Sequence, residues 1–217
     1  MVRKTKEEAA ATRDQLLDSA ESVFFDKGFA NTTLMDVANH AGLTRGAIYW
    51  HFKNKHDLFE AMIERVHLPI EALAEACADE NETDPLGKFK EFSVQLIRLI
   101  ATDKRQQRVF SIMLHKFEFN GDVTQIEDRQ KVSFVECHDR IKRTLKNAIK
   151  RGQLPKDLDL DQAAQVKHGY FTGIVNNWLF YPQSFDLNAM AETIVENYFF
   201  LLTNSPHMRL SQQQAVA

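Results

Sequence analysis

The chain has 217 residues, of which 44% are hydrophobic, and it carries a formal net charge of −3. This length suffices to bury a core in one domain or in two small ones. No run of about 18 apolar residues occurs, and no apolar segment follows the N-terminal charges, which argues against a membrane span and a signal peptide. The charge balance alone neither supports nor excludes nucleic acid as a partner.

Helix-breaking residues are scarce: the chain has 8 Gly and 5 Pro, which are spread out, and this favours an all-α fold. The two cysteines, Cys77 and Cys137, match no metal or redox spacing. They fit small core residues in a reducing compartment. We therefore predict a cytoplasmic protein without a metal or a cofactor.

The N-terminus is a short basic arm that contains Arg3 and Lys4. It is either a solvated terminus or a contact to phosphates and the minor groove. Apolar residues then recur at helical spacing between Glu7 and Lys27. Gly28 follows, where a left-handed residue can end the helix.

Residues 33–51 predict two short helices joined by a tight turn. Thr33 is suited to cap the first helix, and Asp36, three residues later, completes a capping box. Gly42 permits a sharp turn, after which Thr44 caps the second helix. This arrangement is that of a helix-turn-helix.

The second short helix carries its polar and aromatic residues outward. Arg45, one residue past the cap, can reach guanine O6 and N7 in the major groove. Trp50 contacts backbone sugars or braces the helix. The residues predicted to bind DNA are Arg3, Lys4, Thr33, Thr44, Arg45, Gly46, Ala47, Tyr49, Trp50, His51 and Lys55.

A longer helix is expected to start at the cap residue Asn54 and to run to about residue 78. Pro69 lies inside it and predicts a kink or a break. Five more helices are expected at about 84–102, 104–119, 123–151, 161–181 and 187–203. The fold is thus all-α with about nine helices: residues 1–54 bind DNA, residues 55–204 bind ligand and dimerise, and residues 205–217 form a disordered tail.

Twelve of the sixteen Phe lie beyond residue 56. Large rings in a helical bundle either line a cavity or fill the core. On the first interpretation, Gln130, His168 and Asn176 are polar residues that could orient a ligand. The predicted ligand-binding residues are Phe89, Phe92, Leu96, Phe110, Met113, Leu114, Phe117, Phe134, Cys137, Ile141, His168, Phe171 and Asn176.

One recognition helix makes too few contacts for specificity, so two copies about 34 Å apart are expected. Gly169 and Gly173 would allow close approach of a second helix, and the apolar residues near the C-terminus exceed one core face. The alternative is a larger intrachain core. The predicted dimer interface consists of Gly169, Gly173, Trp178, Met190, Ile194, Tyr198, Leu201 and Leu202.

The block TTLMDVANHAGLTRGAIYWHFKNKHDLFEAM resembles the DNA-binding domain of TetR-family transcriptional regulators. The segments MVRKTKEEA, HKFEF and NNWLFYPQSFDL resemble the AcrR-type subgroup, which includes local repressors of multidrug efflux pump operons. The resemblance implies a homodimer, or a pair of dimers, on a palindromic operator. Our hypothesis is that a lipophilic or drug-like ligand releases the protein from DNA, with helix 55–78 as the only continuous connection between pocket and DNA-binding domain.

Two alternatives stay open: a regulator of another operon, such as one for lipid or aromatic-compound metabolism, and a helical ligand-binding protein without DNA activity. An enzyme is not expected, because no Gly-rich phosphate loop and no G-x-S-x-G occurs. Glu64 and His67 have the spacing of a di-iron ligand pair, but no second pair accompanies them.

Overall fold

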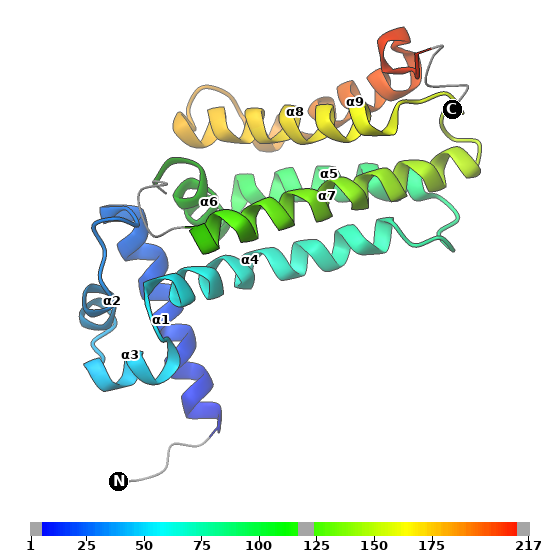
Figure 1. Cartoon of the computed structure of the whole chain (residues 1–217). Coiled ribbons are helices and arrows are strands. Elements are labelled where there is room, and N and C mark those ends of the chain that lie inside the picture. The colour runs from blue at the N-terminus through cyan, green and yellow to red at the C-terminus, as the bar shows by residue number, and fades with distance from the viewer. Residues whose placement is uncertain (1–5, 117–123, 212–217) are drawn as a thin grey trace. The chain divides into compact units, whose positions relative to one another are not determined.

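The computed structural model describes residues 6–116 and 124–211, except for the side chains of Thr124 and Gln125. Within these ranges the fold is all-α, with nine α-helices, as predicted (Figure 1). No helix there is long and apolar enough to cross a membrane. The helices are α1 (Lys6–Lys27), α2 (Leu34–His40), α3 (Arg45–His51), α4 (Lys55–Cys77), α5 (Pro85–Thr102), α6 (Lys104–Ser111), α7 (Thr124–Lys150), α8 (Leu160–Phe180) and α9 (Leu187–Asn204).

The chain forms two compact units. The first comprises Met1–Leu68 and Lys104–Glu127, and the second comprises Pro69–Asp103 and Asp128–Ala217. The chain therefore crosses between the units three times, and two of the crossings lie inside the helices α4 and α7. Helix α4 is thus one of several covalent connections, not the sole one that the sequence suggested.

The first unit is built on α1, which packs against α2, α3 and α6. Leu16, Leu17 and Phe24 of α1 are fully buried, as are Ile48 of α3 and Phe59 of α4. The helix ends at Gly28, whose φ of +78° is readily adopted by glycine but strained for other residues. The π-helical turn Ile112–Lys116 follows α6 and also contacts α1.

The second unit has α5 packed along α9, with α8 beside α9. Helix α5 begins with Asp84 as cap and Pro85 in its first turn, where a missing N–H costs nothing. Leu145, Ala163, Val195 and other apolar side chains of α7, α8 and α9 are fully buried in this unit.

Two sequence-based expectations need correction. Helix α4 continues through Pro69, so the predicted break is absent; the boundary between the two units nevertheless falls between Leu68 and Pro69. The tail was expected to be disordered from residue 205. Residues 206–208 form a 3₁₀ turn with Met208 buried, and the Leu210 N–H donates to the Asp157 carbonyl at 2.8 Å. Residues 212–217 lie outside the described part.

Candidate functional sites

Local hydrogen bonds define the helix-turn-helix. The Thr33 hydroxyl accepts from the Asp36 N–H while the Asp36 carboxylate accepts from the Thr33 N–H, which confirms the predicted capping box. Lys27 donates to the same carboxylate at 2.6 Å. Its hydrogen bond is the largest cause, ahead of those from Thr33, that holds the pKa of Asp36 well below its usual range. Asp36 therefore stays ionised at the start of α2.

The turn between α2 and α3 is fixed from both sides. Gly42 adopts a φ of +66°, and the Leu43 N–H donates to the Ala38 carbonyl at 2.9 Å. From α1, the Gln15 side-chain amide donates to the Ala41 carbonyl at 2.9 Å. The Thr44 hydroxyl then accepts from the Ala47 N–H and caps α3 as predicted.

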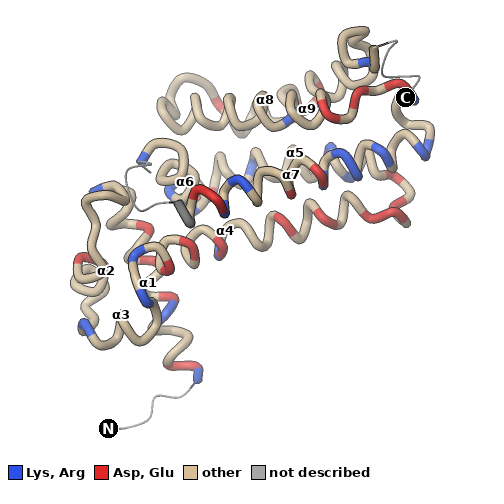
Figure 2. The backbone as a smooth tube through the Cα atoms, in the orientation of Figure 1, with Lys and Arg blue, Asp and Glu red and all other residues tan. Residues whose placement is uncertain are grey.

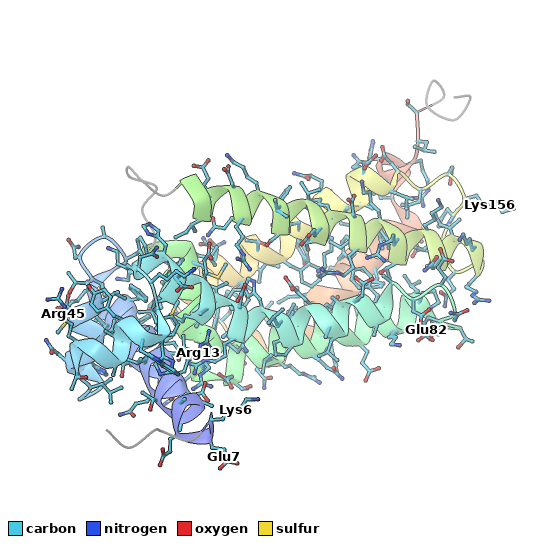
Figure 3. All side chains as sticks on the ribbon, turned by 60° about the horizontal axis from the view of Figure 1, so that its bottom comes forward. Lys6, Glu7, Arg13, Arg45, Glu82 and Lys156 are labelled. Atoms are coloured by element: carbon cyan, nitrogen blue, oxygen red, sulfur yellow. The ribbon has the colours of Figure 1, made fainter. Side chains whose placement is uncertain are left out.

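Helix α3 buries Ile48 and exposes most of its remaining side chains. Arg45 lies on the outer edge of the first unit (Figure 3), and its guanidinium sits over the Tyr49 ring, 5.4 Å from the ring centroid. Trp50 is 70% exposed and its ring lies edge-on against His51. This degree of exposure favours contact with a partner over a bracing role for Trp50.

Lys55 differs from the other predicted DNA-binding residues. Its ammonium donates to the carbonyls of Phe29 and Ala30 at 2.8 and 3.2 Å, and lies over the Phe29 ring. Burial lowers the pKa of this lysine. The ammonium thus holds the segment before α2 in place, whereas a phosphate contact would need it to face solvent. Arg3 and Lys4 lie outside the described residues.

A buried carboxylate links three helices of the first unit. Glu21 of α1 is 1% exposed and accepts from Arg65 of α4 and Arg105 of α6. Asp18, one turn earlier, accepts from the same two arginines at 2.8 and 2.6 Å. A buried carboxylate is tolerated when it is paired and hydrogen-bonded in this way. Sequence reasoning missed Glu21; its place between Leu17 and Phe24 on the buried face of α1 was the available signal.

The predicted ligand-binding residues fall in both units. Phe110, Met113 and Leu114 belong to the first unit, and Phe117 lies outside the described residues. The other nine belong to the second unit. There Phe89, Phe92, Ile141 and Phe171 are buried, Phe134 is 41% exposed, and the remainder are half-buried.

The aromatic residues of the second unit gather around a lysine that was not predicted. Lys167 of α8 is 9% exposed, and its ammonium lies 5.4 Å from the centroid of the Phe89 ring and 4.9 Å from that of Phe171. Phe89 also contacts Phe199, and Phe171 contacts Tyr198. Lys167 shares the buried stripe of α8 with Ala163, Ala164, Phe171, Val175 and Trp178, and this spacing was the signal that could have found it.

A second aromatic group contains two histidines. The rings of Phe134, His138 and His168 lie within 4.0 to 5.0 Å of one another, measured between centroids. The Nδ1 atom of His138 is 2.8 Å from the Phe134 carbonyl oxygen. Its Nε2 atom is buried without a hydrogen-bond partner in the described chain. Burial is the main cause that lowers the pKa of His168, followed by the charges of His138 and Lys167.

A surface hollow of about 620 Å³ lies between α4 and α7, and none of the predicted ligand-binding residues lines it. Its charged rim is held by Glu75, which accepts from Arg140 and Arg143. These hydrogen bonds, that of Arg143 first, lower the pKa of Glu75. Figure 2 shows acidic positions near the end of α4 and basic positions along α7.

The predicted interface residues divide into two sets. Trp178, Ile194, Tyr198 and Leu202 are at most 7% exposed within the single chain, so they form part of its own core. The Trp178 ring N–H donates to the Phe185 carbonyl, and the Tyr198 hydroxyl donates to that of Ala163. Met190 and Leu201 are exposed, as is Gly169, and a Cβ added at Gly169 or Gly173 would meet nothing within 4 Å.

The chain combines a capped helix-turn-helix that exposes an arginine with a helical domain rich in buried aromatic residues. This combination defines a DNA-binding regulator of transcription. Residues 16–62 match the model of bacterial regulatory proteins of the tetR family. Residues 84–204 match the C-terminal region of MAATS-type transcriptional repressors. The chain belongs to the tetR family, which is a family of regulators and not of enzymes.

Relatives are similar over nearly the whole chain. The HTH-type transcriptional regulator TtgR of Pseudomonas putida is 41% identical over 209 residues, covering 96% of this chain and all of the relative. The structure of NalD, the secondary repressor of the MexAB-OprM multidrug efflux pump in Pseudomonas aeruginosa, superposes with a TM-score of 0.81 at 29% identity and covers 91% of this chain and 99% of NalD. SmeT, the repressor of the Stenotrophomonas maltophilia pump SmeDEF, in complex with triclosan gives 0.82 at 30% identity, over 90% of this chain and 93% of SmeT.

Proposed function

We propose that this protein is a repressor that binds a palindromic operator as a dimer, controls a multidrug efflux pump operon in the bacterial cytoplasm and leaves DNA when a lipophilic or drug-like compound binds. The observation that carries the proposal is the exposed face of α3, headed by Arg45. The relatives support the operon: NalD and SmeT are named as efflux pump repressors, and one structure of SmeT is a complex with triclosan.

The geometry of α3 suits insertion into the major groove. Arg45 is the first residue of the helix and has no acidic residue in its own turn. The Tyr49 ring beneath its guanidinium restricts the side chain, so less conformational freedom is lost when it forms two hydrogen bonds to guanine. Tyr49 and His51 are candidates for phosphate contacts, with Arg3 and Lys4 for the minor groove.

Dimerisation is supported by an apolar surface on α8 and α9. Phe180 is 81% exposed and Phe200 65% exposed, with Met190 and Leu201 also open to solvent. Isolated exposure of one such ring is ordinary, but several on two adjacent helices indicate an interface.

Phe200→Asn should convert the dimer into a monomer in sedimentation velocity, whereas Tyr198→Phe in the core should leave the mass unchanged; a dimeric Phe200→Asn variant would place the interface elsewhere.

Release requires that the ligand bind the form incompatible with DNA more tightly. Shifting occupancy from 99:1 to 1:99 takes about 5.5 kcal/mol of differential affinity. Helices α4 and α7 each contain residues of both units, so either provides a continuous backbone along which a change in the second unit reaches the first.

The direct test is Arg45→Ala in an electrophoretic mobility assay with the duplex upstream of the protein's own gene. We expect affinity to fall about 100-fold or more, since one bidentate pair is worth about 1–3 kcal/mol and a dimer forms two. Arg151→Ala, which removes the same charge from an exposed position of the second unit, is the control and should bind as the wild type does. Equal affinity of the wild type and Arg45→Ala would refute the assigned recognition helix.

A further inference from the structure

Lys167 is the one charged residue on the buried stripe of α8. Lysine is almost never fully buried unless its ammonium is paired, because the charge loses its hydration. In the residues that the structure describes, no hydrogen bond or ion pair holds the Lys167 ammonium. A family member that needed this position only for packing would be better served by an apolar side chain.

The surroundings of the ammonium come from four helices of the second unit. Phe89 of α5 and Phe171 of α8 present their rings to it. Among the described residues, the ionisable side chains that act on it are Cys77 on α4 and Cys137 on α7, whose thiols are uncharged at neutral pH, and no carboxylate is among them. Burial lowers the pKa of Lys167, because the charged form loses its hydration.

The neighbouring ionisable groups are bases as well. His168, the next residue, feels the charge of Lys167 and of His138. His138 keeps its buried Nε2 atom without a partner in the described part of the chain. When protonated, His168 is repelled by the charges of both His138 and Lys167, and in the described part of the chain the Lys167 ammonium keeps N–H donors without an acceptor. An anion would both offset the repulsion between the positive charges and accept the hydrogen bonds that the ammonium can donate.

We propose that Lys167, assisted by His138 and His168, is the charge-recognising group of the ligand-binding core, and that the ligands it selects are amphiphilic anions. Such a ligand carries one carboxylate, sulfonate or phenolate on an aromatic or aliphatic body. The acidic group accepts hydrogen bonds from the ammonium, and the body packs against the rings of Phe89 and Phe171. The inference rests on the proposed function, because it names the chemical class of the releasing ligand.

The competing explanation is that Lys167 is a structural residue satisfied by the two phenyl rings alone. In that case its charge would not discriminate between ligands. A pair of probes with one skeleton and different charge separates the two explanations. Anilinonaphthalene sulfonate is an anion, and N-phenylnaphthylamine is its neutral counterpart without the sulfonate; both fluoresce in apolar surroundings.

The experiment measures the Kd of both probes by fluorescence titration for the wild type, Lys167→Met, Lys167→Arg and Lys156→Met. Methionine keeps the volume and removes the charge, and Lys156 is an exposed control (Figure 3). We expect Lys167→Met to weaken the sulfonate at least about tenfold, which is about 1.4 kcal/mol, and to change the neutral probe less than about twofold. Lys167→Arg should retain most of the preference for the anion, and Lys156→Met all of it.

Several results would overturn the inference: no binding of the sulfonate to the wild type, an equal loss of both probes in Lys167→Met, or no loss of either. The same variants are tested on the upstream duplex without probe, where Lys167→Met should bind as the wild type does. If the wild type binds no DNA, the proposed function fails. If the wild type and Lys167→Met both bind DNA and the sulfonate releases them equally, the proposed function stands and the anion site is refuted.

Discussion

Each of the two units holds a lysine over a phenylalanine ring, and the two differ in what accepts their hydrogen bonds. Lys55 has the carbonyls of Phe29 and Ala30, so its ammonium is satisfied within the fold and braces the helix-turn-helix. Among the described residues, Lys167 has the rings of Phe89 and Phe171 and no hydrogen-bond acceptor. The difference teaches that a buried charge stabilises a fold when its partners are internal, and is available to a ligand when they are not.

Glu21 gives the largest expected effect, because it is the most deeply buried charge with internal partners in the first unit. Glu21→Ala should lower the free energy of unfolding by about 3 kcal/mol, since Arg65 loses one acceptor and keeps Asp18. Urea denaturation measures the change. Asp18→Ala, whose side chain is 55% exposed, is the matched control and should cost less than about 1 kcal/mol. Similar losses of unfolding free energy in the two variants would show that the burial of Glu21 does not determine how strongly the cluster stabilises the protein.

Lys55→Met tests the bracing role. It removes two hydrogen bonds to carbonyl oxygens and should destabilise the protein by about 1–2 kcal/mol. The dependence of operator affinity on salt should keep its slope, because a brace neutralises no phosphate. A slope reduced by about two, one for each protomer of the dimer, with unchanged stability would instead make Lys55 a phosphate contact.

Lys167→Met should change the free energy of unfolding in the opposite direction and by the smallest amount. Removing an unpaired buried charge should raise the free energy of unfolding at neutral pH by about 1 kcal/mol. Because burial lowers the pKa of Lys167, the unfolded chain binds its proton more readily, and the wild type gains stability as the pH rises toward the ordinary value of 10.5. The advantage of the variant should therefore shrink with rising pH in urea titrations. A variant less stable than the wild type at every pH would assign Lys167 a structural role.

The helix-turn-helix could be predicted from sequence because its determinants are local. Thr33 and Asp36 are three residues apart, Gly42 adopts the conformation that it alone adopts readily, and Thr44 caps the helix that follows. The outward direction of Arg45 and Trp50 was predicted as well, and Ile48 is the buried residue of this helix. Such signals need no knowledge of the rest of the chain.

The second unit was harder to predict because its determinants are long-range. The sequence near the C-terminus is rich in apolar residues, but sequence alone could not assign Tyr198 to the core and Phe200 to the surface, since both fit a helix face. The pairing of Lys167 with Phe89 joins residues 78 positions apart. Pro69 does not break α4, because the helix tolerates the loss of one backbone hydrogen bond.

The three crossings between the units have a consequence for how this protein can be divided. Helix α6 and the π-helical turn after it contact α1, and Val109 and Ile112 are fully buried there. A fragment that ended at residue 54 or 68 would leave this face of α1 bare to water. Chimeras that exchange ligand specificity between relatives should therefore transplant residues 69–103 and 128–217 together and leave 104–127 with the DNA-binding segment, as two inserts and not one.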